Sequence, residues 1–200
     1  DSAETTVTLE VATVIATPDA FTNTEGGTLQ VPASTGVISN DIETNNLTVT
    51  AEVVNKPAYG VLTFAADGSF SYVHDGSENL RDVFTYKLKN ANDDESKATF
   101  VAINSTNVND TPTSVGTAFT LNEGASLIFI PTYVDTDTAL AGITFAITET
   151  TAISNGFLVN NNNGTFTYTH DGGQSVVDAF TYTINDGEFT VASTGTILVT

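Results

Sequence analysis

One stretch of this chain occurs twice, and this repetition limits what the chain can fold into. The sequence GVLTFAADGSFSYVHDGSENLRDVFTY runs from Gly60 to Tyr86, and GFLVNNNNGTFTYTHDGGQSVVDAFTY runs from Gly156 to Tyr182, 96 residues later and without a gap. The positions that recur unchanged are Gly60, Leu62, Gly68, Phe70, Tyr72, His74, Asp75, Gly76, Asp82, Phe84, Thr85 and Tyr86. A repeat of this length predicts two tandem copies of one domain.

The domain boundaries follow from a second match between the two halves. Residues 19–27 (DAFTNTEGG) resemble residues 117–125 (TAFTLNEGA), and each follows an alternating β segment that ends before a proline. We therefore predict one domain over residues 17–108 and a second over residues 109–200. Residues 1–16 are then the terminal strand of a preceding repeat, which we favour, or the first strand of domain 1. Methionine is absent even at position 1, as expected for a fragment from the interior of a longer polypeptide.

The residue pattern within each copy predicts an all-β fold. Short β-branched segments are separated by turn residues, and no segment has a helical period. Asp67-Gly68 and Asn163-Gly164 predict hairpin turns, because glycine tolerates the positive φ that tight hairpins need. The aromatic residues of the repeat are spaced two apart, so those of one strand share a face and are expected in the core. About seven such strands per domain predict a β-sandwich.

Charge and composition restrict the possible partners. The formal net charge is −19, with only five lysine and arginine residues, so nucleic acid and anionic membranes are repelled. No apolar run approaches the length of a membrane span, so we expect no membrane insertion. Cysteine is absent, so a small exported domain would need another stabilising link, and a bound metal ion is one. The partners that this surface favours are cations.

Alternating strand directions place many of the acidic and amide residues at one junction. Glu25 and Asp82 belong to loops at the C-terminal end of domain 1, where the linker leaves the domain, and loops at the N-terminal end of domain 2 carry further acids. The junction set is Glu25, Asp82, Asn107, Asn109, Asp110, Asp135, Asp137 and Asp186. Such a number of oxygen ligands predicts Ca²⁺, which accepts six to eight in flexible geometry.

The same topology predicts half-sites at the outer ends of the two domains. Asp41 and Glu43, with Asp19 and Asp94, are expected at the N-terminal end of domain 1. Glu123 and Asp178, with Asp171, are expected at the C-terminal end of domain 2. The segment before Pro18 is apolar and lacks the Asn-Asp pair of the central linker. We therefore expect little or no calcium binding at the N-terminal junction.

The residue types also restrict which cation could bind. Magnesium is less suitable because it needs near-octahedral geometry, and zinc is disfavoured because cysteine is absent and the two histidines lie in different domains. Residues 135–140 (DTDTAL) lack the glycine and the terminal glutamate of an EF-hand loop. The alternative to a metal site is that the acids are solvated surface groups, which keep the chain soluble.

The sequence contains no recognisable catalytic motif. His74 and His170 occupy equivalent positions in a repeated His-Asp-Gly, but no cysteine or G-x-S-x-G nucleophile accompanies them. We expect them to stabilise a turn or to lie at the surface. No glycine-rich phosphate loop and no basic patch occurs either. We therefore predict that the chain is not an enzyme.

Taken together, G-x-L, DGSFSY, D-x-FTY and the linker V-N-D-T-P (residues 108–112) resemble the cadherin-like and VCBS-type repeats of bacterial RTX adhesins. Asn40-Asp41-Ile42-Glu43 is similar to the N-D-x-D element of that family, with glutamate in place of the last aspartate. The resemblance implies two tandem Ig/cadherin-like Greek-key β-sandwich domains that bind calcium. The positions that match interdomain calcium ligands of such arrays are Glu25, Asp82, Asn109, Asp110, Asp135 and Asp137.

The resemblance also implies a function in cell adhesion and biofilm formation. It indicates a stalk segment on the bacterial cell surface, outside the cell, which extends a distal ligand-binding region and contacts neighbouring repeats of its own chain. Other parts of the parent protein would bind a glycan or another surface ligand, and the segment itself is expected to be a monomer. A glycan-binding or homophilic adhesion module and an accessory domain of a secreted hydrolase are the alternatives. Exposed aromatic residues on loops would favour glycan binding, and Tyr59 and Tyr133 are the few candidates.

Overall fold

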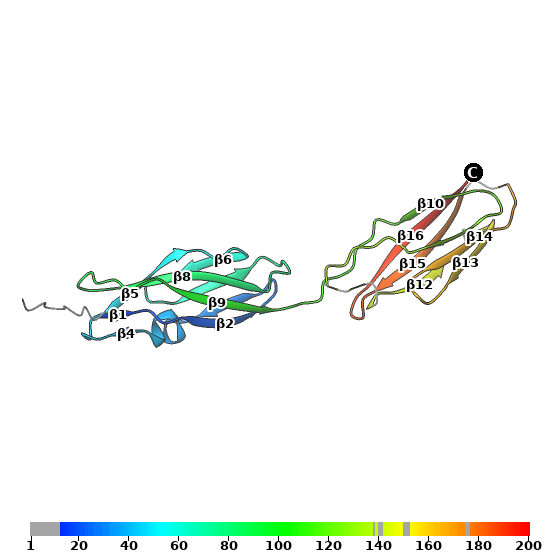
Figure 1. Ribbon diagram of the computed structural model, residues 1–200. Coiled ribbons are helices and arrows are strands. Elements are labelled where there is room, and N and C mark those ends of the chain that lie inside the picture. The colour runs from blue at the N-terminus through cyan, green and yellow to red at the C-terminus, as the bar shows by residue number, and fades with distance from the viewer. Residues whose placement is uncertain (1–12, 138, 140–141, 150–152, 175–176) are drawn as a thin grey trace, which may run out of the picture. The chain divides into compact units, whose positions relative to one another are not determined.

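A computed structural model describes residues 13–137, 139, 142–149, 153–174 and 177–200. The chain divides into two compact units, domain 1 over Asp1–Val108 and domain 2 over Asn109–Thr200, and each is described by itself. Both are built from β-strands, and Figure 1 shows the strands of each domain arranged as two facing layers. The predicted all-β sandwich fold is confirmed for both copies.

Domain 1 consists of a four-stranded and a three-stranded sheet. The larger sheet has the order β2-β9-β8-β5, with β2 Asp19–Thr24, β9 Thr99–Thr106, β8 Arg81–Asn90 and β5 Val49–Asn55. The smaller sheet has the order β3-β7-β6, with β3 Thr28–Val31, β7 Phe70–His74 and β6 Gly60–Phe64. The β2–β9 pair is parallel and the other pairs are antiparallel.

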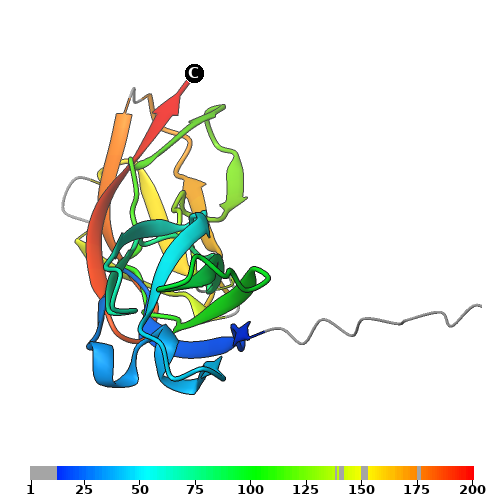
Figure 2. The ribbon, with the colours of Figure 1, turned by 90° about the vertical axis from the view of Figure 1, so that its left-hand side faces the viewer.

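Two additional features of domain 1 lie near its N-terminal end. Strand β1 (Val14–Ile15) pairs with β4 (Ile42–Glu43), and two 3₁₀ helices, η1 (Ala33–Thr35) and η2 (Val37–Asn40), precede β4. Figure 2 shows this helical segment of domain 1 in light blue. Val14 is 2% exposed and packs in the core of domain 1. The prediction for the rest of residues 1–16 falls mostly on residues 1–12, outside the described part of the chain.

Domain 2 has the same strand order as domain 1. Its four-stranded sheet has the order β10-β16-β15-β12, with β10 Thr117–Leu121, β16 Thr190–Val199, β15 Val177–Asn185 and β12 Thr144–Glu149. Its three-stranded sheet has the order β11-β14-β13, with β11 Ser126–Phe129, β14 Phe166–His170 and β13 Gly156–Asn160. The β10–β16 pair is parallel, as is the matching β2–β9 pair of domain 1.

Aromatic side chains of the repeat fill both cores, as predicted. None of the eight is more than 5% exposed; they are Phe70, Tyr72, Phe84, Tyr86, Phe166, Tyr168, Phe180 and Tyr182. The rings of Phe70 and Phe84 meet edge to face at 5.4 Å, and those of Phe166 and Phe180 meet in the same way at 6.2 Å. Because β7 and β8 come from different sheets, the Phe70–Phe84 contact joins the two layers.

The predicted hairpins are present in both domains. Gly68 and Gly164 adopt φ values of +81° and +86° between the paired strands of each hairpin. Residues that carry a side chain rarely adopt such φ values, so the turn requires glycine at these positions. The two hairpins have the same register, with Phe64 opposite Phe70 and Asn160 opposite Phe166.

Gly195 gives a test of core packing in domain 2. A Cβ atom added there would overlap the Phe180 ring on the neighbouring strand. We expect Gly195→Ala to destabilise domain 2 by about 1–3 kcal/mol, because the ring must leave its place in a close-packed core. The exposed neighbour Thr196 supplies the control, Thr196→Ala. Urea unfolding followed by near-ultraviolet circular dichroism measures the difference, and equal stability of the two variants would contradict this packing.

Candidate metal centre

Glu25 lies in domain 1 where the chain leaves the domain. It follows β2 directly, its N–H donates to the Thr106 carbonyl at 2.9 Å, and its Oε2 accepts from the Val108 N–H at 3.1 Å. The residue is 7% exposed, and its Oε1 is buried without a hydrogen-bond partner among the described residues. A buried carboxylate oxygen that lacks a donor is costly, and a cation would remove that cost. The chemistry of this carboxylate therefore fits a calcium ligand.

His74 holds the turn that carries Glu25. Its Nδ1 accepts from the N–H groups of Gly26 at 3.3 Å and Gly76 at 3.1 Å. His170 does the same in domain 2 with Gly124 at 3.0 Å and Gly172 at 3.2 Å. Because two N–H groups point at each Nδ1, this atom is an acceptor and the ring proton is on Nε2. Both histidines are buried, so the expected turn-stabilising role fits and the surface alternative does not.

Within domain 2, the linker is tied to loops that contain the predicted acidic residues. The Asn109 side chain donates to Asp186 at 2.9 Å, and the Asp110 N–H donates to the Asp137 carboxylate. Thr136 donates its hydroxyl to Asp110 at 2.9 Å, and the Asp137 N–H donates to Asp135 at 3.1 Å. Three predicted ligands in the loops are thus joined by hydrogen bonds to two in the linker, and Asp135 is joined through Asp137. We name them the linker group: Asn109, Asp110, Asp135, Asp137 and Asp186.

Asp186 remains an ionised group in this arrangement. Partial burial acts to raise its pKa, but the N–H groups of Phe189 and Glu188 and the Asn109 side chain outweigh this effect and hold the pKa below its usual range. The carboxylate is therefore charged at neutral pH. The four carboxylates and the Asn109 amide of the linker group supply oxygen atoms of the type that a hard divalent cation prefers.

Asp82 accepts hydrogen bonds from other groups of domain 1. It is 4% exposed and accepts from the N–H groups of Ala58 at 2.9 Å, Tyr59 at 2.8 Å and Val83 at 2.8 Å. The buried Tyr72 hydroxyl also donates to it, at 2.9 Å. Both carboxylate oxygens are therefore occupied by protein donors. This geometry favours a structural role over ion binding.

Asp178 forms the equivalent link in domain 2. It is fully buried and accepts from the Ser154 N–H at 3.0 Å, the Asn155 side chain at 2.9 Å and the Tyr168 hydroxyl at 2.5 Å. Burial acts to raise its pKa, but these donors outweigh burial and lower the pKa below its usual range. We name Tyr72–Asp82 and Tyr168–Asp178 the tyrosine–aspartate links. The sequence analysis missed these links, although the repeated Tyr and Asp, ten residues apart in both copies, are a signal from which they could have been found.

The acidic residues at the N-terminal end of domain 1 surround Tyr86. Its buried hydroxyl lies 3.0 Å from both Asp41 oxygens and 3.2 Å from Asp19. The Thr17 N–H donates to Asp41 at 2.7 Å. Burial, with the nearby Asp41 charge, raises the pKa of Asp19 to about 6, and burial also raises that of Asp41. One hydroxyl hydrogen cannot serve both carboxylates, so this pair is short of donors.

The remaining half-site residues are arranged differently. Glu43 accepts from the Leu47 N–H at 2.6 Å, and the Asn90 side chain bridges Glu43 at 3.4 Å and Asp94 at 3.1 Å. Glu43 and Asp94 therefore share the Asn90 side chain as a hydrogen-bond partner. Glu123 in domain 2 is exposed, whereas the matching Glu25 in domain 1 is buried.

These features define a class of protein: tandem β-sandwich repeats with acidic residues collected at the domain ends. The model of the bacterial cadherin-like domain matches residues 10–107 and again residues 109–200. The chain belongs to this family and contains two copies of its domain. The resemblance to cadherin-like tandem repeats is thereby confirmed. No curated protein matches the chain.

Solved structures similar to this chain include protocadherins and a desmocollin ectodomain. Mouse protocadherin-24 EC1-3 matches with a TM-score of 0.60 and 12% identity over 94% of this chain and 70% of that one. Human protocadherin-24 EC1-2 matches with a TM-score of 0.57 and 13% identity over 94% and 97% of the respective chains. The human desmocollin-1 ectodomain matches with a TM-score of 0.52 and 9% identity over 94% of this chain, which spans 42% of its length. Within the described residues, no helix is long and apolar enough to cross a membrane.

Asp19 supplies a test of the charge at the N-terminal end. Its pKa is raised from 3.8 to about 6, so the stabilisation present below pH 3.8 is lost as the pH rises through about 6. We expect Asp19→Asn, without calcium, to raise the stability of domain 1 at neutral pH by about 1 kcal/mol, a value reduced for solvent screening. Thermal unfolding from acidic to neutral pH, with the exposed Asp67→Asn as control, measures this. Parallel pH profiles of wild type and Asp19→Asn would refute the assignment.

Asp178→Asn tests the tyrosine–aspartate link of domain 2. The new amide NH₂ would face the Tyr168 hydroxyl or the Ser154 N–H. Since all these groups are donors, one hydrogen bond would be lost. We therefore expect a loss of about 2–3 kcal/mol in stability, with calcium affinity unchanged. Urea unfolding and calorimetric calcium titration separate the two effects. A stable variant with weakened calcium binding would instead make Asp178 a ligand.

Proposed function

We propose that the chain is a non-catalytic, calcium-rigidified extender segment in the stalk of a bacterial surface adhesin of the RTX, VCBS-repeat type, outside the cell. The observation that carries this proposal is that each domain, taken by itself, gathers oxygen ligands where it meets the linker. Domain 1 brings Glu25 to the Val108 N–H, and domain 2 ties Asn109 and Asp110 to its acidic loops. The family membership supports an adhesion or extender module.

Calcium ions would bind to these residues and reduce the repulsion between their charges. The proposed ligand set is Glu25, Asn107, Asn109, Asp110, Asp135, Asp137 and Asp186. A carboxylate cluster without cations repels itself, and the linker is then free to move. Bound ions that take ligands from the linker and from both domains would fix the linker. The two domains would then act as one strut.

Asp82 and Asp178 are left out of this set because they are buried and their oxygens accept hydrogen bonds inside the domains, whereas Asp186 is only half-buried. Asp41, Glu43 and Glu123 are proposed as half-sites that a neighbouring repeat would complete. The stalk would hold a distal ligand-binding region away from the cell surface. Its immediate partners would be the neighbouring repeats of its own chain, and the fragment itself would be a monomer.

A paired substitution in the linker group tests calcium binding. Asp110→Asn with Asp137→Asn removes two charges and retains the shape of both side chains. We expect calcium affinity to fall by at least about tenfold, because affinity depends on the number of ligand charges. Isothermal titration calorimetry with calcium chloride measures this. The control is Asp67→Asn, which copies Asn163 at the matching hairpin turn and lies outside the proposed sites.

The possible results of this titration lead to opposite conclusions. Weak binding by the paired variant together with normal binding by the control supports the proposal. Equal affinity of wild type and paired variant, or no calcium binding by the wild-type chain, overturns it. If the wild-type chain binds no calcium, the acidic residues serve only as solvated surface groups.

A further inference from the structure

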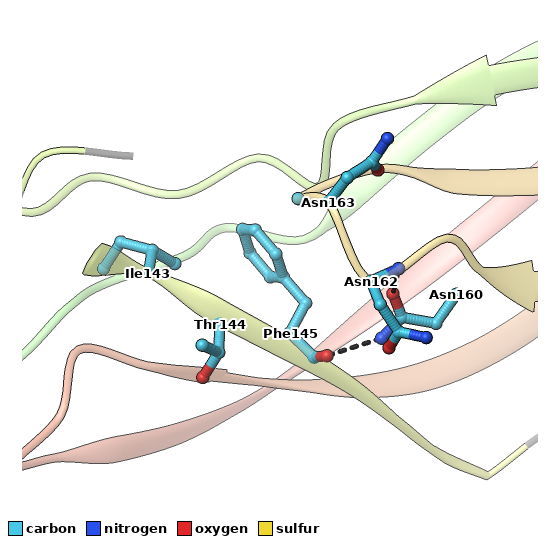
Figure 3. A pocket seen from close by; sticks show the side chains of 7 residues that line it. Ile143, Thr144, Phe145, Asn160, Asn162 and Asn163 are labelled. Carbon is cyan, nitrogen blue, oxygen red and sulfur yellow. Dashed lines mark hydrogen bonds between the residues drawn. The ribbon is translucent and has the colours of Figure 1, made fainter. Parts of the chain in front are cut away.

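Domain 2 contains a hollow of about 760 Å³ between β12 and the β13–β14 hairpin. Its described lining consists of Ile143, Thr144, Phe145, Asn160, Asn162, Asn163 and Gly164. Figure 3 shows the segment Ile143–Phe145 on one side and the three asparagines of the hairpin on the other. None of these lining residues is charged, although the chain has a formal net charge of −19. The volume falls within the range of small-molecule sites.

Some side-chain amide groups that line this hollow make no hydrogen bond to the described part of domain 2. Asn160 is occupied, because its Nδ2 donates to the Phe145 carbonyl at 2.6 Å and its Oδ1 accepts from the Asn162 N–H at 2.8 Å. The Asn163 Oδ1 accepts from the N–H and hydroxyl of Thr165. Within the described part of domain 2, the Asn162 carboxamide and the Asn163 Nδ2 make no hydrogen bond. Both donors and acceptors are therefore available to a ligand.

Domain 1 shows that the fold does not need these amides. The repeat offset places Phe64, Ala66 and Asp67 at the positions of Asn160, Asn162 and Asn163. Strand pairing places Ala51, opposite Leu88, at the position of Phe145, opposite Ile184.

In domain 1 most of these positions line a smaller hollow of about 420 Å³, which the charged residues Glu52 and Lys56 also border. The Ala51 N–H donates to the Ala66 carbonyl at 2.9 Å, the Val37 N–H donates to the Gly68 carbonyl at 3.1 Å, and Phe64 packs against Phe84. In domain 2 the aromatic residue is on β12 and not in the hairpin: Phe145 packs there against Phe166, with ring centroids 6.2 Å apart. Amides then take the hairpin positions.

We propose that this hollow binds a neutral saccharide unit. A sugar hydroxyl both donates and accepts hydrogen bonds, which matches the carboxamides of Asn162 and Asn163. Ile143 and Phe145 line the hollow with only 4% and 8% of their surface exposed, and this small apolar area would contact C–H groups of a sugar ring. An anionic ligand would meet no basic side chain, since domain 2 contains no lysine or arginine, and a metal ion would meet no carboxylate in the described lining. This site does not depend on the proposed calcium function.

The test is nuclear magnetic resonance of the ¹⁵N-labelled whole chain at fixed calcium concentration. Maltotriose, cellotriose and xylotriose are the probes, added up to tens of millimolar. We expect at least one of them to produce saturable shifts of the Asn162 and Asn163 side-chain amide signals. The variant Asn162→Ala with Asn163→Asp copies Ala66 and Asp67 of domain 1, and it is expected to bind at least about tenfold more weakly.

The control variant is Asn161→Ala. The Asn161 side chain bonds to Thr165 and Thr167 and does not line the hollow, so affinity should be retained. An unchanged backbone spectrum of domain 2 establishes that each variant is folded. The proposal is overturned if no probe gives a saturable shift, or if the domain 1 copy binds as well as the wild type. Neither failure affects the calcium proposal, because none of its ligands lines the hollow.

Discussion

An excess of carboxylate charge is the constraint on which this structure depends. Domain 2 has nine aspartate and glutamate residues and no lysine or arginine, and all five basic residues of the chain lie in domain 1. Ion pairing within domain 2 therefore cannot neutralise its acids. Some are stabilised by protein donors, as in the tyrosine–aspartate links. Others collect in the linker group, where hydrogen bonds tie Asp110 to Asp137 and Asn109 to Asp186 without adding positive charge. The divalent cations of the proposed function would offset this charge.

The β-sandwich places the carboxylates that accept protein hydrogen bonds and the carboxylates of the linker group in different regions of the domain. Strand β7 directs Tyr72 inward to Asp82, and β14 directs Tyr168 to Asp178, so these carboxylates lie within the domain. Loops after the strands carry Glu25, Asp135 and Asp137 to the domain ends. The buried turn histidines connect the two regions, since His74 bonds to Gly26, next to Glu25. Hydrogen bonds from the buried part of domain 1 thus hold the turn that carries Glu25.

The sequence alone was sufficient for the fold because the evidence for it is local. Aromatics at Phe70 and Tyr72, and glycines at Gly68 and Gly164, specify strand faces and turns within a few residues. The short 3₁₀ helices were missed because a single turn at Ala33–Thr35 or Val37–Asn40 gives no helical period. The structural role of Asp82 and Asp178 was also missed. It depends on contacts with backbone N–H groups more than 20 residues away, which residue type does not reveal. The hollow beside Phe145 depends on a side-chain exchange between two strands, and only the strand pairing identifies that exchange.

Small-angle X-ray scattering of this chain, with calcium and then with excess EGTA, tests the central claim most directly. If ions fix the linker, the calcium-bound chain has one well-defined maximum dimension. Chelation then broadens the distance distribution, as expected for two domains on a flexible tether. Profiles that superimpose in calcium and in EGTA would contradict the account, because the acidic groups at the domain ends would then have no effect on the linker.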